Sequence, residues 1–289
     1  MLSGSCSLVG NHWDHVSILN VFKYTLEHIC HPEADQDPRI DLPPSVRAGL
    51  GGPVTRRYLD AAALYARSCR RAAAEIADPP VNDVPHHSEM ANSGTMQYET
   101  QAELPARVAL AVAAARRAGF TKSCLPQQGR LLQLLAAGIG AGRIGETGTG
   151  LGVGLAWMVS MAHAGAQLFS VERDRERATR AREVFAGEPR VDVRCGDWRD
   201  LACEAPFDML VLDGGGQGKA DEPPLQPADW LRPGGIVVLD DFTPMTSWPP
   251  HHDGRLDEAR MYWLEHPQLR TAEIRIMPTA ASLVATYIG

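Results

Sequence analysis

The sequence predicts an α/β fold: a mostly parallel sheet that ends in an antiparallel hairpin. From Pro126 onward, short apolar segments rich in β-branched residues alternate with segments of helical periodicity. A glycine-rich stretch, GETGTGLGVG at 145–154, follows the first strand and opens a helix, where open α/β sheets bind ligands. The last two apolar segments are separated by a turn-like Thr-Ala, which is typical of a hairpin.

The first 95 residues have a different character. Stretches rich in Pro, Asp, Gly and Ser at 31–53 and 78–94 indicate loops or linkers. Helical patterns occur at 17–29 and 56–77. We therefore expect an N-terminal helical, loop-rich extension at 1–95, serving as a cap or dimerisation arm, and a second domain at 96–289.

The elements of the second domain follow in order. A helix is expected over 102–120, closed by Gly119, and another over 126–138, ending at Gly138. The expected strands are 143–147, 166–172, 191–195, 207–213 and 235–241, the helices between them are 154–164, 175–186 and 224–231, and the hairpin strands are 271–278 and 281–288.

Composition and charge exclude several classes of protein. The chain has 289 residues, of which 44% are hydrophobic and 22% charged, as in ordinary globular proteins. Its net charge of −7 argues against a nucleic-acid or anionic-membrane partner. The sequence shows neither a membrane-spanning apolar run nor a signal peptide. The six cysteines lack metal or disulfide spacing, so we expect reduced thiols and a cytoplasmic location.

The glycine loop does not fit a diphosphate site. After the first strand no three glycines have G-x-G-x-x-G spacing, and no lysine provides a G-x-x-x-x-G-K motif. The upstream GAGRIG at 140–145 matches by letters but lies before and within the strand, so a dehydrogenase is disfavoured. What remains is an acidic residue with alternating glycines: Glu146, Gly148, Gly150 and Gly152.

Residues after the next two strands complete a nucleoside pattern. Glu172 ends the second strand, where a carboxylate can accept hydrogen bonds from two vicinal ribose hydroxyls. Asp197 follows the third strand and can accept from an adenine amine, while Trp198 can cover a ring face. Alternatively, Asp197 caps the next helix and Trp198 packs in the core.

These blocks together resemble a known family. QQGRLLQLLA, ETGTGLGVG, VERD, GDW, FDMLVLD and LRPGGIVVLDD occur in the order of class I S-adenosylmethionine-dependent methyltransferases. In detail, 126–289 is similar to the catechol and caffeoyl-CoA type O-methyltransferases and their bacterial relatives. The resemblance implies a Rossmann-like seven-stranded sheet with a reversed last strand and S-adenosylmethionine as methyl donor. The expected donor-binding residues are Glu146, Gly148, Thr149, Gly150, Gly152, Glu172, Asp197, Trp198 and Asp213.

Three carboxylates are expected at the same sheet edge. Asp213 ends the fourth strand, and Asp240 and Asp241 end the fifth. Close carboxylates repel unless a cation or protons compensate them, and Mg²⁺ prefers such oxygen ligands. In the resembling family these positions carry an Asp and an Asp-Asn pair that hold Mg²⁺ and activate the acceptor hydroxyl. Here Asp241 replaces the asparagine and adds a negative charge. Alternatively, Asp240 or Asp241 caps a loop and the enzyme is metal-free.

The proton acceptor departs from the family pattern. The family has a lysine three residues after the first metal aspartate, where this chain has Gly216. Lys219, in a glycine-rich insert, is expected to fold back as the catalytic base, with Asp213 beside it. His251, next to His252, is an alternative base or substrate contact.

The predicted function is methyl transfer from S-adenosylmethionine to a small-molecule hydroxyl, on an aromatic compound or secondary metabolite, with a divalent metal such as Mg²⁺. Two alternatives remain. One is a metal-free N- or C-methyltransferase. The other is an inactive methyltransferase-fold interaction protein with 1–95 as its working surface. The N-terminal helices would suit a homodimer.

Overall fold

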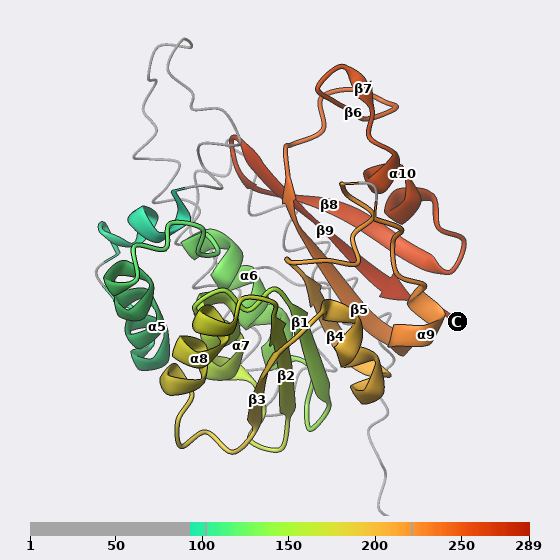
Figure 1. The fold of residues 1–289 in the computed structure, drawn as a ribbon. Helices are drawn as coiled ribbons and strands as arrows, with labels where there is room; N and C mark the ends of the chain where they lie inside the picture. The colour runs from blue at the N-terminus through green and yellow to red at the C-terminus, as the bar shows by residue number, and fades with distance from the viewer. Residues whose placement is uncertain (1–92, 102, 221) are drawn as a thin grey trace, which may run out of the picture. The chain divides into compact units, whose positions relative to one another are not determined.

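A seven-stranded mixed sheet forms the centre of the fold in this computed structural model, which describes residues 93–101, 103–220 and 222–289 (Figure 1). The strand order is β3-β2-β1-β4-β5-β9-β8. The first five strands pair in parallel, and β9 runs antiparallel to both β5 and β8. The predicted α/β fold and its reversed last strand are confirmed. The strands are β1 Arg143–Thr147, β2 Gln167–Glu172, β3 Val191–Cys195, β4 Phe207–Leu212, β5 Leu231–Phe242, β8 Leu269–Met277 and β9 Ala280–Tyr287.

Helices cover both faces of this sheet, as expected when parallel strands are apolar throughout. Figure 1 shows α5, α7 and α8 gathered beside β1–β3, and α10 beside β8. Proline begins α6, and Asp174 caps α8 by accepting from the Arg177 amide at 2.9 Å. The helices are α5 Ala106–Arg117, α6 Pro126–Ala137, α7 Val153–Met161, α8 Arg175–Val184, α9 Pro227–Trp230 and α10 Glu258–Glu265, with 3₁₀ turns η1 Gly94–Tyr98 and η2 Trp198–Glu204.

A large apolar cluster of the described residues lies on the sheet face that carries Phe169, Phe207 and Leu239. Trp230 of α9 and Trp263 of α10 pack into the same cluster and are 7% and 0% exposed. Burial of these large side chains fixes the strand ends that surround the site described below.

Several elements differ from the sequence predictions. The helix expected at 224–231 shortens to α9, because β5 already begins at Leu231. The two-stranded ribbon of β6 His251–His252 and β7 Arg255–Leu256, the helix α10, and both 3₁₀ turns were not predicted. The helices expected at 17–29 and 56–77 lie outside the described residues, so the 1–95 extension and its boundary stay predictions. No helix in the described ranges is long and apolar enough to cross a bilayer.

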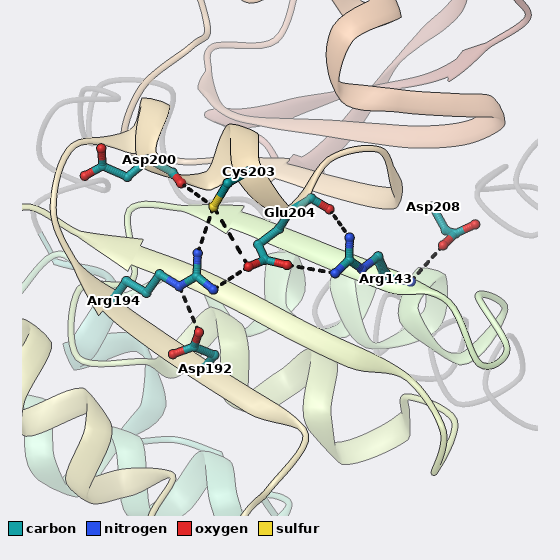
Figure 2. Close-up of polar contacts among 7 residues, drawn as sticks. All are labelled: Arg143, Asp192, Arg194, Asp200, Cys203, Glu204 and Asp208. Atoms are coloured by element: carbon teal, nitrogen blue, oxygen red, sulfur yellow. Dashed lines mark hydrogen bonds and ion pairs between the residues drawn. The ribbon is translucent and has the colours of Figure 1, made fainter.

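An ion-pair network anchors η2 at the end remote from Trp198 (Figure 2). The Glu204 carboxylate accepts from Arg143 Nη2 at 2.7 Å and from Arg194 Nη2 at 2.5 Å. Both guanidinium groups also lie over the Phe169 ring, 5.1 and 5.7 Å from its centroid. Arg194 Nε pairs with Asp192 at 2.8 Å. The network therefore ties β1 and β3 to η2, whose first residue, Trp198, lies at the site.

Candidate active site

A cavity of about 660 Å³ opens at the carboxyl ends of the parallel strands, within the size range of cofactor and substrate sites. The loop after β1 borders it on one side and the ends of β4 and β5 on another. Most of the sequence-predicted residues line it, namely Glu146, Gly148, Thr149, Gly150, Glu172, Asp197, Trp198, Asp213, Asp240 and Asp241. The structure thus brings together residues that are nearly one hundred positions apart in the chain.

The glycine loop makes a close backbone approach to the end of β4. Gly148 has φ +90°, in the left-handed region. A Cβ on Gly148 would lie 2.7 Å from the Gly214 Cα, so no side chain fits without moving backbone. Gly152 does not line the cavity. It is the N-cap of α7, and its Cβ would meet the Phe185 ring at 2.7 Å, which indicates a packing requirement.

Glu172 holds the glycine loop through its carboxylate. Its Oε2 accepts from the Gly150 amide at 2.9 Å. Its Oε1 accepts from the Asp174 amide and from Arg177 Nη2, both at 2.8 Å. The side chain is 7% exposed and lines the cavity, so Arg177 balances a largely buried negative charge.

Glu146 begins a buried hydrogen-bond chain beneath the loop. Ser170 Oγ donates to Glu146 Oε2, and Ser170 and Thr149 share a further hydroxyl–hydroxyl bond. Glu146 is 3% exposed, and burial raises its pKa from 4.5 to about 8. In the ligand-free protein this carboxyl is therefore mostly protonated near neutral pH, and a nearby positive charge on a ligand would favour its ionised form.

Asp197 and Trp198 have local partners as well as places on the cavity wall. Asp197 Oδ1 accepts from the Arg199 amide at 3.0 Å and closes a capping box with Asp200, so the capping alternative is realised. The Arg199 amide is the largest cause of the lowered pKa of Asp197. Trp198 Nε1 donates to Glu222 at 2.7 Å, and its ring packs 5.5 Å from that of Trp230.

Asp213, Asp240 and Asp241 form an acidic cluster. One carboxylate oxygen of each lies within 4.8 Å of the others. Asp240 Oδ1 accepts from the Asp241 amide at 2.8 Å and from Ser282 Oγ at 3.1 Å. Burial, and then the neighbouring aspartates, raise the pKa of Asp213 well above its usual value and that of Asp240 to about 7. Three converging oxygen donors that repel one another fit a hard divalent cation such as Mg²⁺.

Lys219 and His251, the two candidate bases, lie in different surroundings. The glycine-rich insert returns Lys219 to the end of β5, where Nζ donates to the carbonyl oxygens of Asp240 at 2.9 Å and Asp241 at 2.7 Å. Burial lowers the pKa of this ammonium group. His251 is exposed on β6, with Nδ1 2.8 Å from the Pro249 carbonyl oxygen. Neither residue is among the described residues that line the cavity.

Other cavity residues were not predicted from the sequence. The segment 119–125, between α5 and α6, contributes one wall and includes Cys124, and burial raises the pKa of this thiol. Ala280 and Ala281 of β9 also line the cavity. Ser170 does not line the cavity but donates to Glu146 from within β2, and its polar side chain between Phe169 and Val171 was the available signal.

Comparisons with known proteins agree with this geometry. A family model described as "Methyltransferase domain" matches residues 146–242. A catechol O-methyltransferase of Niastella koreensis is 32% identical over 164 residues, which cover 52% of this chain and 69% of that protein.

Solved structures match the fold. The O-methyltransferase TomG from Streptomyces achromogenes, solved in complex with SAM, is 19% identical over 71% of this chain and all of its own, with a TM-score of 0.52. A putative O-methyltransferase from Klebsiella pneumoniae is 20% identical over 70% of this chain and all of its own, with a TM-score of 0.53. At these identities the two structures support the fold alone.

Proposed function

Because this chain belongs to the S-adenosylmethionine-dependent O-methyltransferases, we propose that it methylates a small-molecule hydroxyl held beside a divalent metal ion. The observation that carries this proposal is the shared cavity. Its wall includes the glycine loop after β1 and all three carboxylates of the acidic cluster. A donor on the loop and an acceptor near the cluster would therefore lie in one space, as direct methyl transfer requires.

The donor half of the cavity has groups suited to each part of S-adenosylmethionine. The Glu172 carboxylate, at the end of β2, is proposed to accept from the ribose hydroxyls. Asp197 would accept from the adenine amine, and the Trp198 ring would cover the base. Ionised Glu146 would balance the positive charge of the methionine portion. The loop residues Gly148 and Gly150, both at positive φ, would let the backbone approach the ligand, and Thr149 and Asp213 line the same wall.

The acceptor half rests on Asp213, Asp240 and Asp241. These residues would hold the metal ion, because they offer three converging oxygen donors, with Asp213 and Asp240 half-buried and Asp241 exposed. When bound, the ion would supply positive charge that favours the ionised form of the acceptor hydroxyl. The carboxylates themselves must lose their protons first, which the raised pKa of Asp240 opposes below about pH 7.

The acceptor itself is proposed to be an aromatic compound or secondary metabolite carrying vicinal oxygens. Trp248 is 60% exposed and Met245 36% exposed on the segment after β5, so apolar side chains are available close in sequence to the acidic cluster. The homodimer expected from the N-terminal extension stays a prediction, which light scattering of the full chain would test.

The experiment is a calorimetric titration of the full chain with S-adenosylhomocysteine and a catechol, each with and without Mg²⁺. We expect donor-product binding in both conditions and catechol binding only with Mg²⁺. An Asp240→Asn variant should still bind S-adenosylhomocysteine but should no longer bind catechol in the presence of Mg²⁺. Catechol methylation that persists in excess chelator would contradict the metal assignment, and absence of S-adenosylhomocysteine binding would contradict the donor site.

A further inference from the structure

Lys219 is held by backbone carbonyl groups at the end of β5. Its Nζ donates to the carbonyl oxygens of Asp240 and Asp241, at 2.9 and 2.7 Å. The same atom lies 3.9 Å from the centroid of the Phe242 ring. Two of the three N–H donors of the ammonium group are thus used by two consecutive residues of the acidic cluster.

The backbone at this point needs such support. Asp241 has φ +63°, a left-handed conformation that costs a non-glycine residue about 1 kcal/mol or more. The strand pairing between β5 and β9 also shifts register between Leu239 and Phe242. Regular backbone hydrogen bonds between β5 and β9 therefore do not hold the backbone of Asp240 and Asp241. The hydrogen bonds from Lys219 to their carbonyl oxygens hold it instead.

A second cation, which is buried, holds the residue that follows Phe242. Arg260 of α10 is 1% exposed, and its Nη2 donates to the Thr243 carbonyl oxygen at 2.8 Å. Its guanidinium group lies 5.0 Å from the Phe242 centroid. Asp257 and Glu273 balance this charge, at 3.0 and 3.1 Å. The carboxylates of the acidic cluster, Asp241 first, act to raise the pKa of Lys219 and so favour the ammonium form that makes these hydrogen bonds.

We infer that Lys219 is a positioning residue: its ammonium group clamps the Asp240–Asp241 backbone and so aims their carboxylates at one point. This inference rests on the proposed function, since the cluster is the site proposed to hold a cation. It differs from the base role expected for Lys219 from the sequence. A base must reach the acceptor proton, whereas Nζ is bonded to backbone oxygens and Lys219 does not line the described cavity.

The test compares Lys219→Met with Lys219→Arg. Arginine cannot act as a base but can donate to both carbonyl oxygens, whereas methionine keeps the apolar stem and loses every donor. Arg275→Met, which removes an exposed cation from β8, is the control. Three quantities are measured on the full chain: Mn²⁺ affinity, kcat for catechol methylation at saturating Mg²⁺, and amide hydrogen exchange of peptides spanning 236–245.

For Lys219→Met we expect Mn²⁺ affinity to fall about tenfold or more, as when an outer-shell partner of a metal ligand is removed. Exchange across 236–245 should accelerate, and kcat at saturating Mg²⁺ should stay within a few-fold of wild type. Lys219→Arg should recover both affinity and exchange protection. S-adenosylhomocysteine affinity should be unchanged in all variants.

Two results would overturn the inference. One is a kcat loss of about 10²-fold or more in both variants at saturating Mg²⁺, which is the size of a lost general base. The other is unchanged exchange across 236–245 in Lys219→Met. If the wild-type chain binds no Mn²⁺, the metal assignment fails separately, and the exchange measurement alone decides the role of Lys219.

Discussion

Replacing Glu146 with glutamine should remove a large pH dependence of stability from the ligand-free protein. Glu146 is 3% exposed, and burial raises its pKa from 4.5 to about 8. A carboxyl whose folded pKa exceeds its unfolded pKa stabilises the fold below the unfolded value, and this contribution is lost as pH rises through the folded value. For this shift the loss amounts to about 4 kcal/mol between about pH 5 and about pH 8.5.

The assay is urea unfolding of wild type, Glu146→Gln and the exposed control Glu183→Gln at these two pH values. Glutamine can still accept from Ser170 Oγ, so the packing of the hydrogen-bond chain is kept. Asp213 and Asp240 titrate in the same direction in all three proteins, and the comparison with wild type removes their share, except for the smaller part of the raised pKa of Asp213 that the charge of Glu146 causes. The free energy of unfolding of Glu146→Gln relative to wild type should rise by about 4 kcal/mol from the lower to the higher pH.

Donor binding gives a second measurement of the protonation state of Glu146. With a pKa of about 8, Glu146 carries about 0.9 proton at about pH 7. If donor binding ionises it, S-adenosylhomocysteine titrations in buffers of different ionisation enthalpy should report release of most of a proton, and Glu146→Gln should release none. If the stability of Glu146→Gln relative to wild type changes by less than about 1 kcal/mol between the two pH values, and both proteins release equal numbers of protons, Glu146 is not protonated in the ligand-free protein.

Three further predictions follow from other parts of the structure. Gly148→Ala should abolish S-adenosylhomocysteine binding or folding, because its Cβ would strike Gly214. The control Gly140→Ala is also at positive φ but has no atom within 4 Å of the added Cβ, so it should lower the free energy of thermal unfolding by only about 1 kcal/mol. Equal effects of the two substitutions would contradict the close approach of Gly148 to Gly214. Asp240→Asn should weaken Mn²⁺ binding about 10²-fold by calorimetry and leave S-adenosylhomocysteine affinity within about twofold, and a parallel loss of both would argue against separate subsites. Glu204→Gln, which weakens the pairs with two arginines in Figure 2, should lower the free energy of unfolding by about 1 to 2 kcal/mol at low salt without changing kcat; a selective loss of kcat would contradict a purely structural role.

Much of the fold follows from local sequence signals. The strand at 191–195 has the predicted bounds, because VDVRC alternates between apolar and polar residues. The strand at 143–147 also has the predicted bounds, although RIGET is neither apolar nor alternating, because it directly precedes the glycine loop. The hairpin of β8 and β9 was predicted from the brief turn between them. The α10 helix was missed although Asp257 caps it, accepting from the Arg260 amide at 3.0 Å, because its short run of eight residues has weak periodicity.

The positions of site residues at strand ends could be predicted from the sequence. The positions of site residues on loops were harder to predict. Glu172 and Asp213 follow parallel strands, so topology alone places them at the cavity. The direction in which the Lys219 side chain points depends on the conformation of the loop after β4. Trp263 of α10 holds this loop, because its Nε1 donates to the Gln217 carbonyl oxygen at 2.8 Å. No local pattern reports a contact between residues so far apart, so the sequence could place Lys219 near the cluster but not direct its Nζ to the backbone.

If the methyl donor and the metal ion share one cavity, a paramagnetic ion at the acidic cluster must lie close to the methyl group of the bound donor. S-adenosylmethionine carrying a ¹³C-labelled S-methyl group is bound to the full chain, and its methyl resonance is followed while Mn²⁺ is titrated in. We expect strong paramagnetic broadening of the bound methyl signal in wild type and little in Asp240→Asn at the same Mn²⁺ concentration. A bound methyl signal that stays sharp in wild type at saturating Mn²⁺, or broadens equally in both proteins, would contradict it.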